Sequence, residues 1–316
     1  MIDGILNVYK EQGYTSFDVV AKLRGILKQK KIGHTGTLDP MAEGVLPVCL
    51  GKATKLSGML TESDKQYEAV MLLGYDTDTE DVTGRVLSVG ASDISNEDIK
   101  SVIESFVGEY EQLPPMYSAI KVGGKKLYEY ARAGESVERT PRHVEIYSID
   151  DISVYELDVS EAGLGSEFVI ANGGTYKCIS MMVHCSKGTY IRSLCRDIGK
   201  SLGSFGTLMA LKRKEAHGNK IEDAIKLDEI KALYDKGELE GYIMPMDSLL
   251  QEYERADIRE EFKNSLLNGN KLLDTYFEKA DIDREHAVRV YYDGNLYGLY
   301  QYEKKIGMFK PVKMFL

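Results

Sequence analysis

Paired cysteines and long apolar runs are both missing from this 316-residue chain. Its four cysteines, Cys49, Cys178, Cys185 and Cys195, include no Cys-x-x-Cys pair and no Cys/His spacing of a zinc site. Reduced thiols and no metal are therefore expected. No stretch approaches the ~20 apolar residues that a membrane-spanning helix needs. The start, MIDGILNVYK, also lacks the basic and apolar regions of a signal peptide. We expect a cytoplasmic protein that does not contact a membrane.

Positive charge is also scarce, with 40 Lys and Arg against 50 Asp and Glu and a net charge of −10. Taken alone, this argues against nucleic-acid binding, because affinity for phosphate requires concentrated positive charge. The distribution is uneven, however. Lys and Arg are concentrated in four runs, at 22–31, 121–132, 187–200 and 212–214. Each run could be a solvated face. If the chain binds nucleic acid, the runs should converge on one face, with the acidic runs 76–81 and 252–261 elsewhere.

Apolar periodicity predicts an α+β domain. Tyr67, Ala69, Met71 and Leu73 alternate as on one face of a strand. Further strands are expected at 4–9, 45–50, 178–185 and 208–216, and 32–44 is expected to be a loop or irregular hairpin. Helices are expected after Thr15 or Ser16, after Ser95 as far as Gly108, and from Thr189 to about Leu202.

The pattern changes around Met244-Pro245-Met246, where we place a domain boundary. Beyond it we expect one helix at 257–267 and then short strands. Asp293-Gly294, followed by Asn295, predicts a hairpin between 288–292 and 296–302. A small β-rich domain at 247–316 is the expected result.

The most informative stretch runs from Gly33 to Pro47, GHTGTLDPMAEGVLP. Here Asp39 lies between glycines and prolines, on a rigid and irregular backbone that suits a positioned catalytic group. A bare Asp-Pro is more often a turn in which the carboxylate caps an amide. Two other patterns, GKAT at 51–54 and the acidic 76–81, depart from phosphate-loop and calcium-loop motifs. They are expected to be a turn and a solvated loop.

Residue after residue, the stretch 33–47 resembles the catalytic motif of the TruB-type tRNA pseudouridine-55 synthases. The likeness continues, in order, through KQYEA at 65–69, PMYSAIK at 115–121, CSKGTYIR at 185–192 and LKR at 211–213. The chain after 246 resembles the family's PUA-type RNA-binding module. It departs from the family at Glu11, where proline is common, and at Gly206-Thr207, where many members have Ala-His. The connection at 158–175 is longer than usual, and we expect it to be a surface loop.

The resemblance implies the pseudouridine-synthase fold, a central mixed, mostly antiparallel sheet flanked by helices and loops. Residues 1–246 would form the catalytic domain, with a thumb-like RNA-binding segment at about 108–143, and 247–316 a PUA-like domain. The substrate would be the TΨC stem-loop of tRNA, in which uridine 55 becomes pseudouridine. A stand-alone, guide-independent monomer with no obligate protein partner is expected. A guide-dependent synthase of the dyskerin type and a non-catalytic tRNA chaperone are the alternatives.

Pseudouridine formation breaks the C1′–N1 bond, turns the uracil and rejoins it through C5. Because nothing is added or lost, neither a cofactor nor a metal is needed. One carboxylate suffices, whereas a glycoside hydrolase needs two. By resemblance Asp39 is that carboxylate, as nucleophile at C1′ or base at C2′. Tyr67 would lie against the flipped base and is a candidate for the C5 deprotonation. Arg192 would hold Asp39 ionised through a charge-assisted hydrogen bond, although by spacing alone it is a surface arginine.

Four further residues are assigned to substrate binding. His34 would fill the place vacated in the RNA or brace the flipped nucleotide, although a lone histidine is more often structural. Tyr190 and Leu211 would line the uracil pocket, and both could equally be core residues. Lys10, at the end of the first predicted strand, completes the set.

Overall fold

The computed structural model describes residues 1–60, 63–158, 160 and 174–316. The predicted surface loop at 158–175 therefore lies, apart from its ends, outside the described residues. No helix in the described part of the chain is long and apolar enough to cross a membrane.

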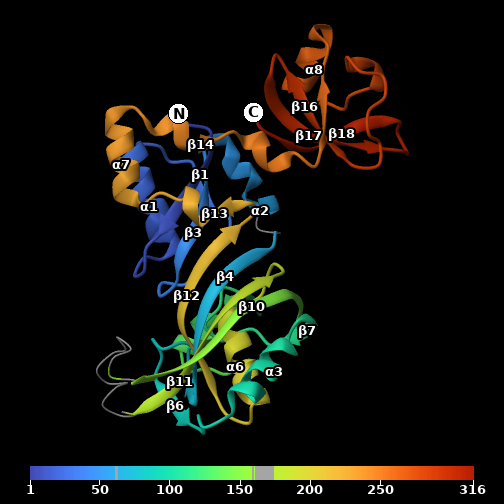
Figure 1. Cartoon of the computed structure of the whole chain (residues 1–316). Coiled ribbons are helices and arrows are strands. Elements are labelled where there is room, and N and C mark those ends of the chain that lie inside the picture. Colours follow the sequence, from blue (N-terminus) through green and yellow to red (C-terminus); the bar gives the residue numbers. More distant parts are fainter. Residues whose placement is uncertain (61–62, 159, 161–173) are drawn as a thin grey trace.

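A mixed sheet of ten strands forms the body of the molecule, in the order β14-β1-β3-β12-β4-β11-β10-β7, with β2 also paired to β3 and β13 to β12 (Figure 1). Strand β12 runs parallel to β3, and the other neighbours are antiparallel. The expected mixed, mostly antiparallel sheet is thus confirmed. The strands are β1 (Gly4–Lys10), β2 (Ile32–His34), β3 (Glu43–Leu50), β4 (Lys65–Leu73), β7 (Gly108–Gln112), β10 (Arg142–Asp158), β11 (Thr175–Cys185), β12 (Gly206–Ala216), β13 (Asn219–Lys220) and β14 (Ile243–Met244).

Two groups of helices cover this sheet at different ends (Figure 1). Helix α1 (Ser16–Leu27) begins at the predicted capping box of Thr15 and Asp18 and packs with α7 (Leu227–Lys236) against β1 and β3. Helices α3 (Asn96–Glu104) and α6 (Ile191–Ser201) pack on β4, β11 and β12. Ser95 caps α3 as expected, but the helix ends at Glu104, and Gly108 starts β7 instead.

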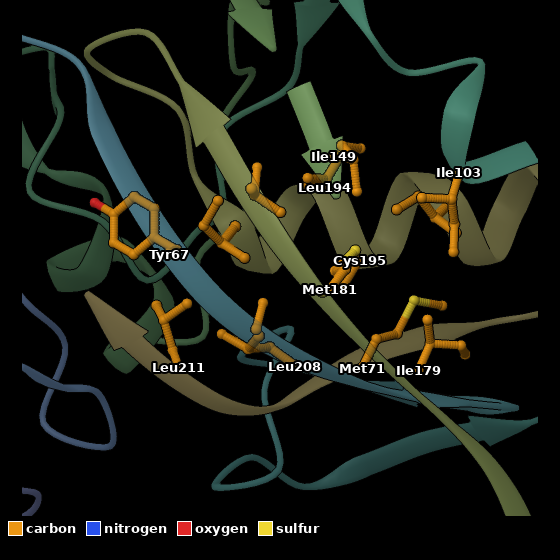
Figure 2. Packing of buried hydrophobic residues seen from close by; sticks show 14 of the residues in the cluster. Tyr67, Met71, Ile103, Ile149, Ile179, Met181, Leu194, Cys195, Leu208 and Leu211 are labelled. Carbon is orange, nitrogen blue, oxygen red and sulfur yellow. The ribbon is translucent and has the colours of Figure 1, made fainter. Parts of the chain in front are cut away.

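The core beneath α6 is closely packed (Figure 2). Met71, Ile179 and Leu208 come from three adjacent strands and are fully buried. Burying each such side chain contributes roughly 1.5–3 kcal/mol relative to leaving it in water. Tyr67, Ala69, Met71 and Leu73 all belong to this core cluster, as their alternation predicts, whereas Leu72 is buried in a separate cluster.

Short elements connect these layers. They are η1 (Gly51–Leu56), α2 (Ser57–Leu60), β5 (Tyr75–Thr77), β6 (Val86–Val89), β8 (Lys121–Val122), β9 (Lys125–Lys126), α4 (Leu127–Arg132), η3 (Ile221–Asp223), η4 (Leu239–Tyr242) and η5 (Met246–Leu250). Strands β5 and β6 form one small hairpin, and β8 and β9 another within the 108–143 segment.

The C-terminal part is a β-rich unit with a four-stranded sheet of β15 (Glu254–Asp257), β16 (Ala287–Tyr292), β17 (Asn295–Glu303) and β18 (Met308–Met314). The predicted hairpin at Asp293-Gly294 joins β16 and β17. The helix predicted at 257–267 is wrong over its first half. Asp257 pairs with Tyr291 at the end of β15, and only α8 (Lys263–Leu267) is α-helical, after η6 (Glu260–Phe262). A further turn, η7 (Asp274–Tyr276), precedes β16.

The C-terminal unit and the ten-stranded sheet are joined by a hydrophobic contact. Leu250, Leu299 and Phe315 pack with residues of β1, β3 and η1, and all three are buried. The partner side chains are Ile5, Cys49, Ala53 and Leu56. The C-terminal unit is therefore docked on the larger domain by apolar packing.

Candidate active site

Asp39 lies on the loop between β2 and β3, and this loop is fastened at several points. The hydroxyl of Ser16, the first residue of α1, accepts from the Leu38 amide at 2.9 Å and donates to the Leu38 carbonyl at 3.2 Å. The Ala42 amide donates to the Asp39 carbonyl at 3.1 Å. At the return into β3, Gly44 has φ +106°, and a Cβ there would lie 2.3 Å from the Arg213 carbonyl oxygen. Only glycine fits this position.

The structure brings Asp39 and Arg192 together across the sheet. Nε of Arg192 lies 2.9 Å from Oδ2 of Asp39. The Arg192 side chain is 5% exposed, whereas that of Asp39 is 33% exposed. The contact is an ion pair through one nitrogen, because the other two nitrogens donate to the carbonyls of Thr79, at 3.0 Å, and Tyr117, at 2.9 Å. Asp39 is thus held from behind by a buried cation and remains open on its other side.

Burial raises the pKa of the Asp39 carboxyl above its ordinary value. Arg192 and Lys10 act in the opposite direction, and the nearby anion of Asp81 adds to the increase. The ionised form of Asp39 therefore depends mainly on Arg192, because removing this cation would leave only the smaller effect of Lys10 to oppose desolvation.

Tyr67 and Leu211 lie at one end of the hydrophobic core beneath α6, and the Tyr67 hydroxyl points away from the other core side chains (Figure 2). Tyr67 is 8% exposed and shares its cluster with Leu38 and Met41 of the Asp39 loop. Burial raises the pKa of the Tyr67 phenol, while Arg213 opposes this. Tyr67 is consequently a neutral phenol at neutral pH, beside the loop that carries the carboxylate.

Lys10 and His34 support the same loop from the backbone side. The buried Lys10 ammonium donates to the carbonyls of Tyr14, Glu11 and Pro40 at 2.6, 3.2 and 3.4 Å. Burial lowers the pKa of Lys10 to about 8. Nδ1 of His34 accepts from the Gly36 amide at 3.3 Å, and burial lowers the pKa of the imidazole. Both side chains are engaged with the chain itself in this structure.

Tyr190 immediately precedes α6, two residues before Arg192. The Gln112 side chain clamps its backbone, accepting from the Tyr190 amide at 2.8 Å and donating to its carbonyl at 3.1 Å. Burial raises the pKa of the Tyr190 phenol, and Ser118 and Arg192 lower it. Tyr190 is therefore within electrostatic reach of Arg192, and its place in the uracil pocket stays a prediction.

Comparison with known families identifies the family of this chain. Residues 24–191 match the model of the TruB family pseudouridylate synthase N-terminal domain, and residues 192–251 match that of the tRNA pseudouridylate synthase B C-terminal domain. The chain belongs to the TruB family of pseudouridylate synthases. Its enzyme class is therefore that of an isomerase.

Relatives of this TruB-family chain match along its whole length. A protein of Lachnoclostridium phytofermentans named tRNA pseudouridine synthase B is 47% identical over 322 residues, covering 100% of both chains. One of Clostridium kluyveri with the same name is 42% identical over 315 residues, again covering 100% of both. Among solved structures, a Cbf5-Nop10-Gar1 complex aligns with a TM-score of 0.67 and 26% identity, covering 99% of this chain and 85% of that chain. The pseudouridine-synthase fold is thereby confirmed.

Arg213 also contacts the Asp39 loop, although the sequence assigned it no role at the site. It is 1% exposed, and its guanidinium donates to the Val45 carbonyl at 2.7 Å and the Gly36 carbonyl at 3.2 Å. It therefore supports both ends of the Asp39 loop. Its place in a basic run suggested phosphate contact. The Leu-Lys-Arg element at 211–213 was the available signal.

The acidic run 76–81 is not the solvated loop that its composition predicts. Glu80 is 9% and Asp81 is 4% exposed. Asp81 accepts from the Thr83 amide at 2.9 Å and from the Thr79 hydroxyl at 2.8 Å, and its Oδ2 is 3.9 Å from a terminal nitrogen of Arg192. Within the described residues, no cluster of three or more His, Cys, Asp or Glu is arranged to hold a metal ion. These carboxylates instead balance buried arginines.

Two of the basic runs are also less exposed than expected. Arg192 and Arg196 are buried within 187–200, as is Arg213 within 212–214. Lys212 lies 3.0 Å from Glu43, and Lys214 lies 3.6 Å from Glu68. Lys187 and Lys200 are exposed at the two ends of the 187–200 run. Most exposed cations of the four runs, however, lie in the other two, at Lys22, Arg24, Lys28, Lys30, Lys31, Lys121, Lys125 and Arg132. The convergence of the four runs on one face stays a prediction.

Proposed function

We propose that this TruB-family chain isomerises uridine 55 in the TΨC arm of cytoplasmic tRNA, as a stand-alone, guide-independent monomer. The observation that carries the proposal is the 33% exposed Asp39 carboxylate, paired at 2.9 Å with buried Arg192. The relatives that match the whole chain bear the name tRNA pseudouridine synthase B at 42–47% identity. This favours tRNA over a guided substrate, because the Cbf5 neighbour is only 26% identical.

Asp39 is proposed as the catalytic carboxylate. Attack at C1′ and proton removal at C2′ both require an ionised oxygen directed toward the ribose. Arg192 occupies one side of the carboxylate and leaves the other accessible. The C1′–N1 bond breaks, the uracil turns, the C5–C1′ bond forms, the C5 proton leaves, and N1 gains a proton in its place. No atom is gained or lost, so none of these steps calls for a cofactor.

The target uridine must leave its stack to reach Asp39, at a cost of about a few kcal/mol. Contact of the flipped base with Tyr67 and Leu211, both 8% exposed, and with half-buried Tyr190 is proposed to return this energy. Because Tyr67 is a neutral phenol, it can contact the base without first changing its protonation state. Removal of the C5 proton by Tyr67 would require loss of its own proton first.

Lys10 and His34 are proposed to act mainly through the loop. The Lys10 ammonium is occupied by three carbonyls, including that of Pro40 next to Asp39. His34 is bonded to the Gly36 amide, and an imidazole so placed could still brace a flipped nucleotide through its other nitrogen. The C-terminal β unit and the 108–143 segment are proposed to bind the tRNA away from the reacting base.

The test is conversion of an unmodified tRNA transcript by purified protein alone, with pseudouridine mapped base by base. Pseudouridine at position 55, without guide RNA or added protein, is expected. A transcript with cytidine at position 55 serves as the control and should acquire none. Conversion elsewhere, or only with an added RNA or protein, would overturn the proposal. Tight tRNA binding without conversion would instead favour the chaperone function.

A further inference from the structure

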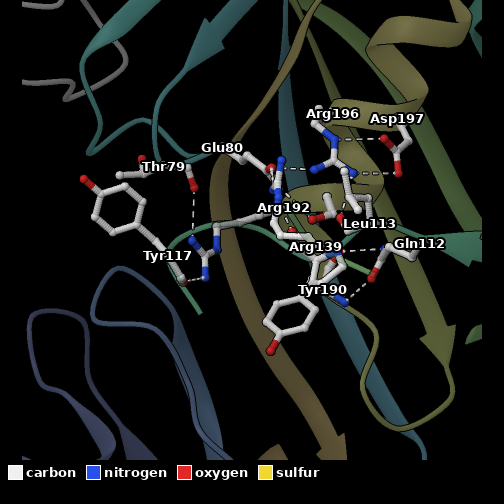
Figure 3. A network of polar contacts seen from close by, with 12 residues as sticks. Thr79, Glu80, Gln112, Leu113, Tyr117, Arg139, Tyr190, Arg192, Arg196 and Asp197 are labelled. Carbon is white, nitrogen blue, oxygen red and sulfur yellow. Dashed lines mark hydrogen bonds and ion pairs between the residues drawn. The ribbon is translucent and has the colours of Figure 1, made fainter. Parts of the chain in front are cut away.

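Glu80 is a buried carboxylate outside the proposed catalytic set, and both of its oxygens are engaged (Figure 3). Ser193 of α6 donates to Oε2 at 2.7 Å, and Oε1 forms an ion pair with Arg196, one helical turn further along. Arg139 lies 4.0 Å from the same oxygen. Glu80 itself has φ +62°, in the left-handed region that a non-glycine residue adopts only when its surroundings favour it.

The two cations beside Glu80 hold the base of the 108–143 segment. Arg196 donates to the Leu113 carbonyl at 2.9 Å, where the chain leaves β7. Arg139 lies where the chain returns toward β10, and it donates to the Pro114 carbonyl on the outgoing side at 2.8 Å. One buried carboxylate is thus next to the contacts that fasten the segment on its outgoing and returning sides.

The same contacts lead to Arg192. Its two terminal nitrogens donate to the carbonyls of Thr79, which directly precedes Glu80, and Tyr117, which belongs to the segment fastened beside Glu80. Figure 3 shows Arg192 directed toward these two residues. The guanidinium is rigid and planar, so fixing two of its nitrogens fixes the third. That third nitrogen is Nε, which forms the 2.9 Å ion pair with Oδ2 of Asp39.

We propose that Glu80 is a positioning residue for the isomerisation, which holds Arg192 against Asp39 by fixing the Thr79 backbone and the base of the 108–143 segment. The proposal rests on the proposed role of Asp39. If Glu80 has this role, Asp39 is ionised and correctly oriented only when the base of the 108–143 segment is held in place. RNA contact with the segment would then act on the chemical step as well as on affinity.

The pH profile separates this role from a direct effect of the Glu80 charge. The charged and titratable groups that face Asp39 are Arg192 from α6, Asp81, Lys10 from β1, Tyr67 from β4 and Tyr190. If Glu80→Gln loosens Arg192, the pKa of Asp39 rises and the acid limb of the rate moves to higher pH. Removing an anion would by itself lower that pKa and move the limb to lower pH. The two explanations predict opposite signs.

The experiment measures single-turnover conversion of a tRNA transcript with saturating enzyme, across pH, together with tRNA affinity. Glu80→Gln keeps the shape, and Arg196 keeps its pairing with Asp197 at 2.9 Å, so the fold is expected to survive. The rate should fall about tenfold to a hundredfold, as for a misplaced catalytic group, with affinity unchanged within about threefold. Asp78→Asn, in the same acidic run 76–81 as Glu80, is the matched control. It removes a charge whose carboxylate accepts from the Arg85 amide at 2.9 Å, and it should leave both quantities unchanged.

An unchanged rate, or an acid limb that moves to lower pH, would overturn the proposal. So would a loss of rate that saturating enzyme restores, since this would show a binding defect only. If Glu80→Gln does not fold, Ser193→Ala decides with the same readouts. It removes one hydrogen bond and no charge, and a decrease of about fivefold in rate with the same direction of pH shift is expected.

Asp39→Asn is measured in parallel. If it retains activity, the proposed function fails, whereas an inactive Asp39→Asn with a normal Glu80→Gln refutes the positioning role alone.

Discussion

At the scale of single residues, the proposed site combines a partly exposed anion with buried cations. Asp39 is accessible, whereas Arg192, Lys10 and Arg213 are enclosed and bonded to backbone carbonyls. A cation fixed in this way costs nothing to reorganise during the reaction and acts in a low-dielectric setting. The loop that carries Asp39 is therefore rigid on its protein side and free on the side where a nucleotide would enter.

Asp39→Asn is expected to abolish isomerisation while leaving tRNA affinity within about severalfold, because an amide keeps the shape but lacks the ionised oxygen. The wild-type rate should also fall as the pH decreases, since Asp39 becomes protonated. Burial raises its pKa, so the midpoint should lie above the ordinary value for aspartate of about 3.9. Single-turnover rates and binding measured on the same transcript check both expectations. Residual turnover of more than about a few per cent would contradict the assignment.

Arg192→Lys should also isomerise poorly, by roughly a hundredfold less than the wild type, a loss comparable to misplacing a catalytic group. An ammonium on a flexible stem cannot meet Asp39, the Thr79 carbonyl and the Tyr117 carbonyl together, as the guanidinium does. Arg24→Lys is a suitable control, because Arg24 is exposed and its terminal nitrogen makes one 3.3 Å bond to the Ile32 carbonyl. Equal rates for the two variants would show that charge alone suffices at position 192.

At the scale of elements, α1 and α6 have different tasks. The N-terminal residue of α1, Ser16, fastens the Asp39 loop, and the exposed Lys and Arg of its C-terminal half lie in the 22–31 run. Helix α6 has a buried face that carries Arg192, Ser193 and Arg196. A run of basic residues on a helix therefore has two different structural roles in this protein. On α1 it provides exposed charge, and on α6 it provides internal ion pairs.

Charge reversal at Lys30 and Lys31 is expected to lower tRNA affinity and to flatten its dependence on salt. Each lost contact with a duplex phosphate should reduce the slope of log K against log salt by about 0.9. Lys100→Glu, an exposed position on α3, is the control and should change the slope little. A titration over salt concentration measures both. An unchanged slope for the double variant would exclude the 22–31 run from the RNA interface.

At the scale of the whole molecule, the C-terminal β unit is more than an appended module. Leu250, Leu299 and Phe315 cover apolar side chains of β1, β3 and η1. Deleting the chain after Met246 should weaken tRNA binding more than the chemical step. The deletion also uncovers Ile5 and Leu56, so unfolding of the remaining domain must be measured beside the single-turnover rate. Complete loss of rate in a domain that is still folded would contradict the predicted boundary or role.

Phe315→Ala isolates the docking contact. Phe315 is fully buried, and its amide donates to the Tyr297 carbonyl at 2.7 Å. Removing its ring should lower the free energy of unfolding by about 3 kcal/mol, as for other buried phenylalanines. Val312→Ala on β18 is the matched control, since Val312 is 59% exposed. Equilibrium unfolding in denaturant measures both, and equal midpoints would show that the ring contributes nothing to docking.

Local features of this protein were determined by sequence alone. The capping box at Thr15 and Asp18, the alternation along β4 and the Asp293-Gly294 hairpin depend on residues within a few positions of one another. The stretch around Asp39 is equally local, and the family resemblance follows from it. Such features are readable because their partners are adjacent in the chain.

Tertiary structure decided which charges are buried. Glu80 meets Ser193 and Arg196, which lie 113 and 116 positions away, and Arg213 meets the Gly36 carbonyl at a separation of 177. In the sequence these residues belong to acidic and basic runs that are indistinguishable from solvated faces. The start of the helix predicted at 257–267 was decided in the same way, because Asp257 pairs with β16 as the last residue of β15 and only α8 is α-helical. A charged side chain can be buried only where a distant partner offsets its desolvation, and that partner becomes known only when the strands and helices are packed together.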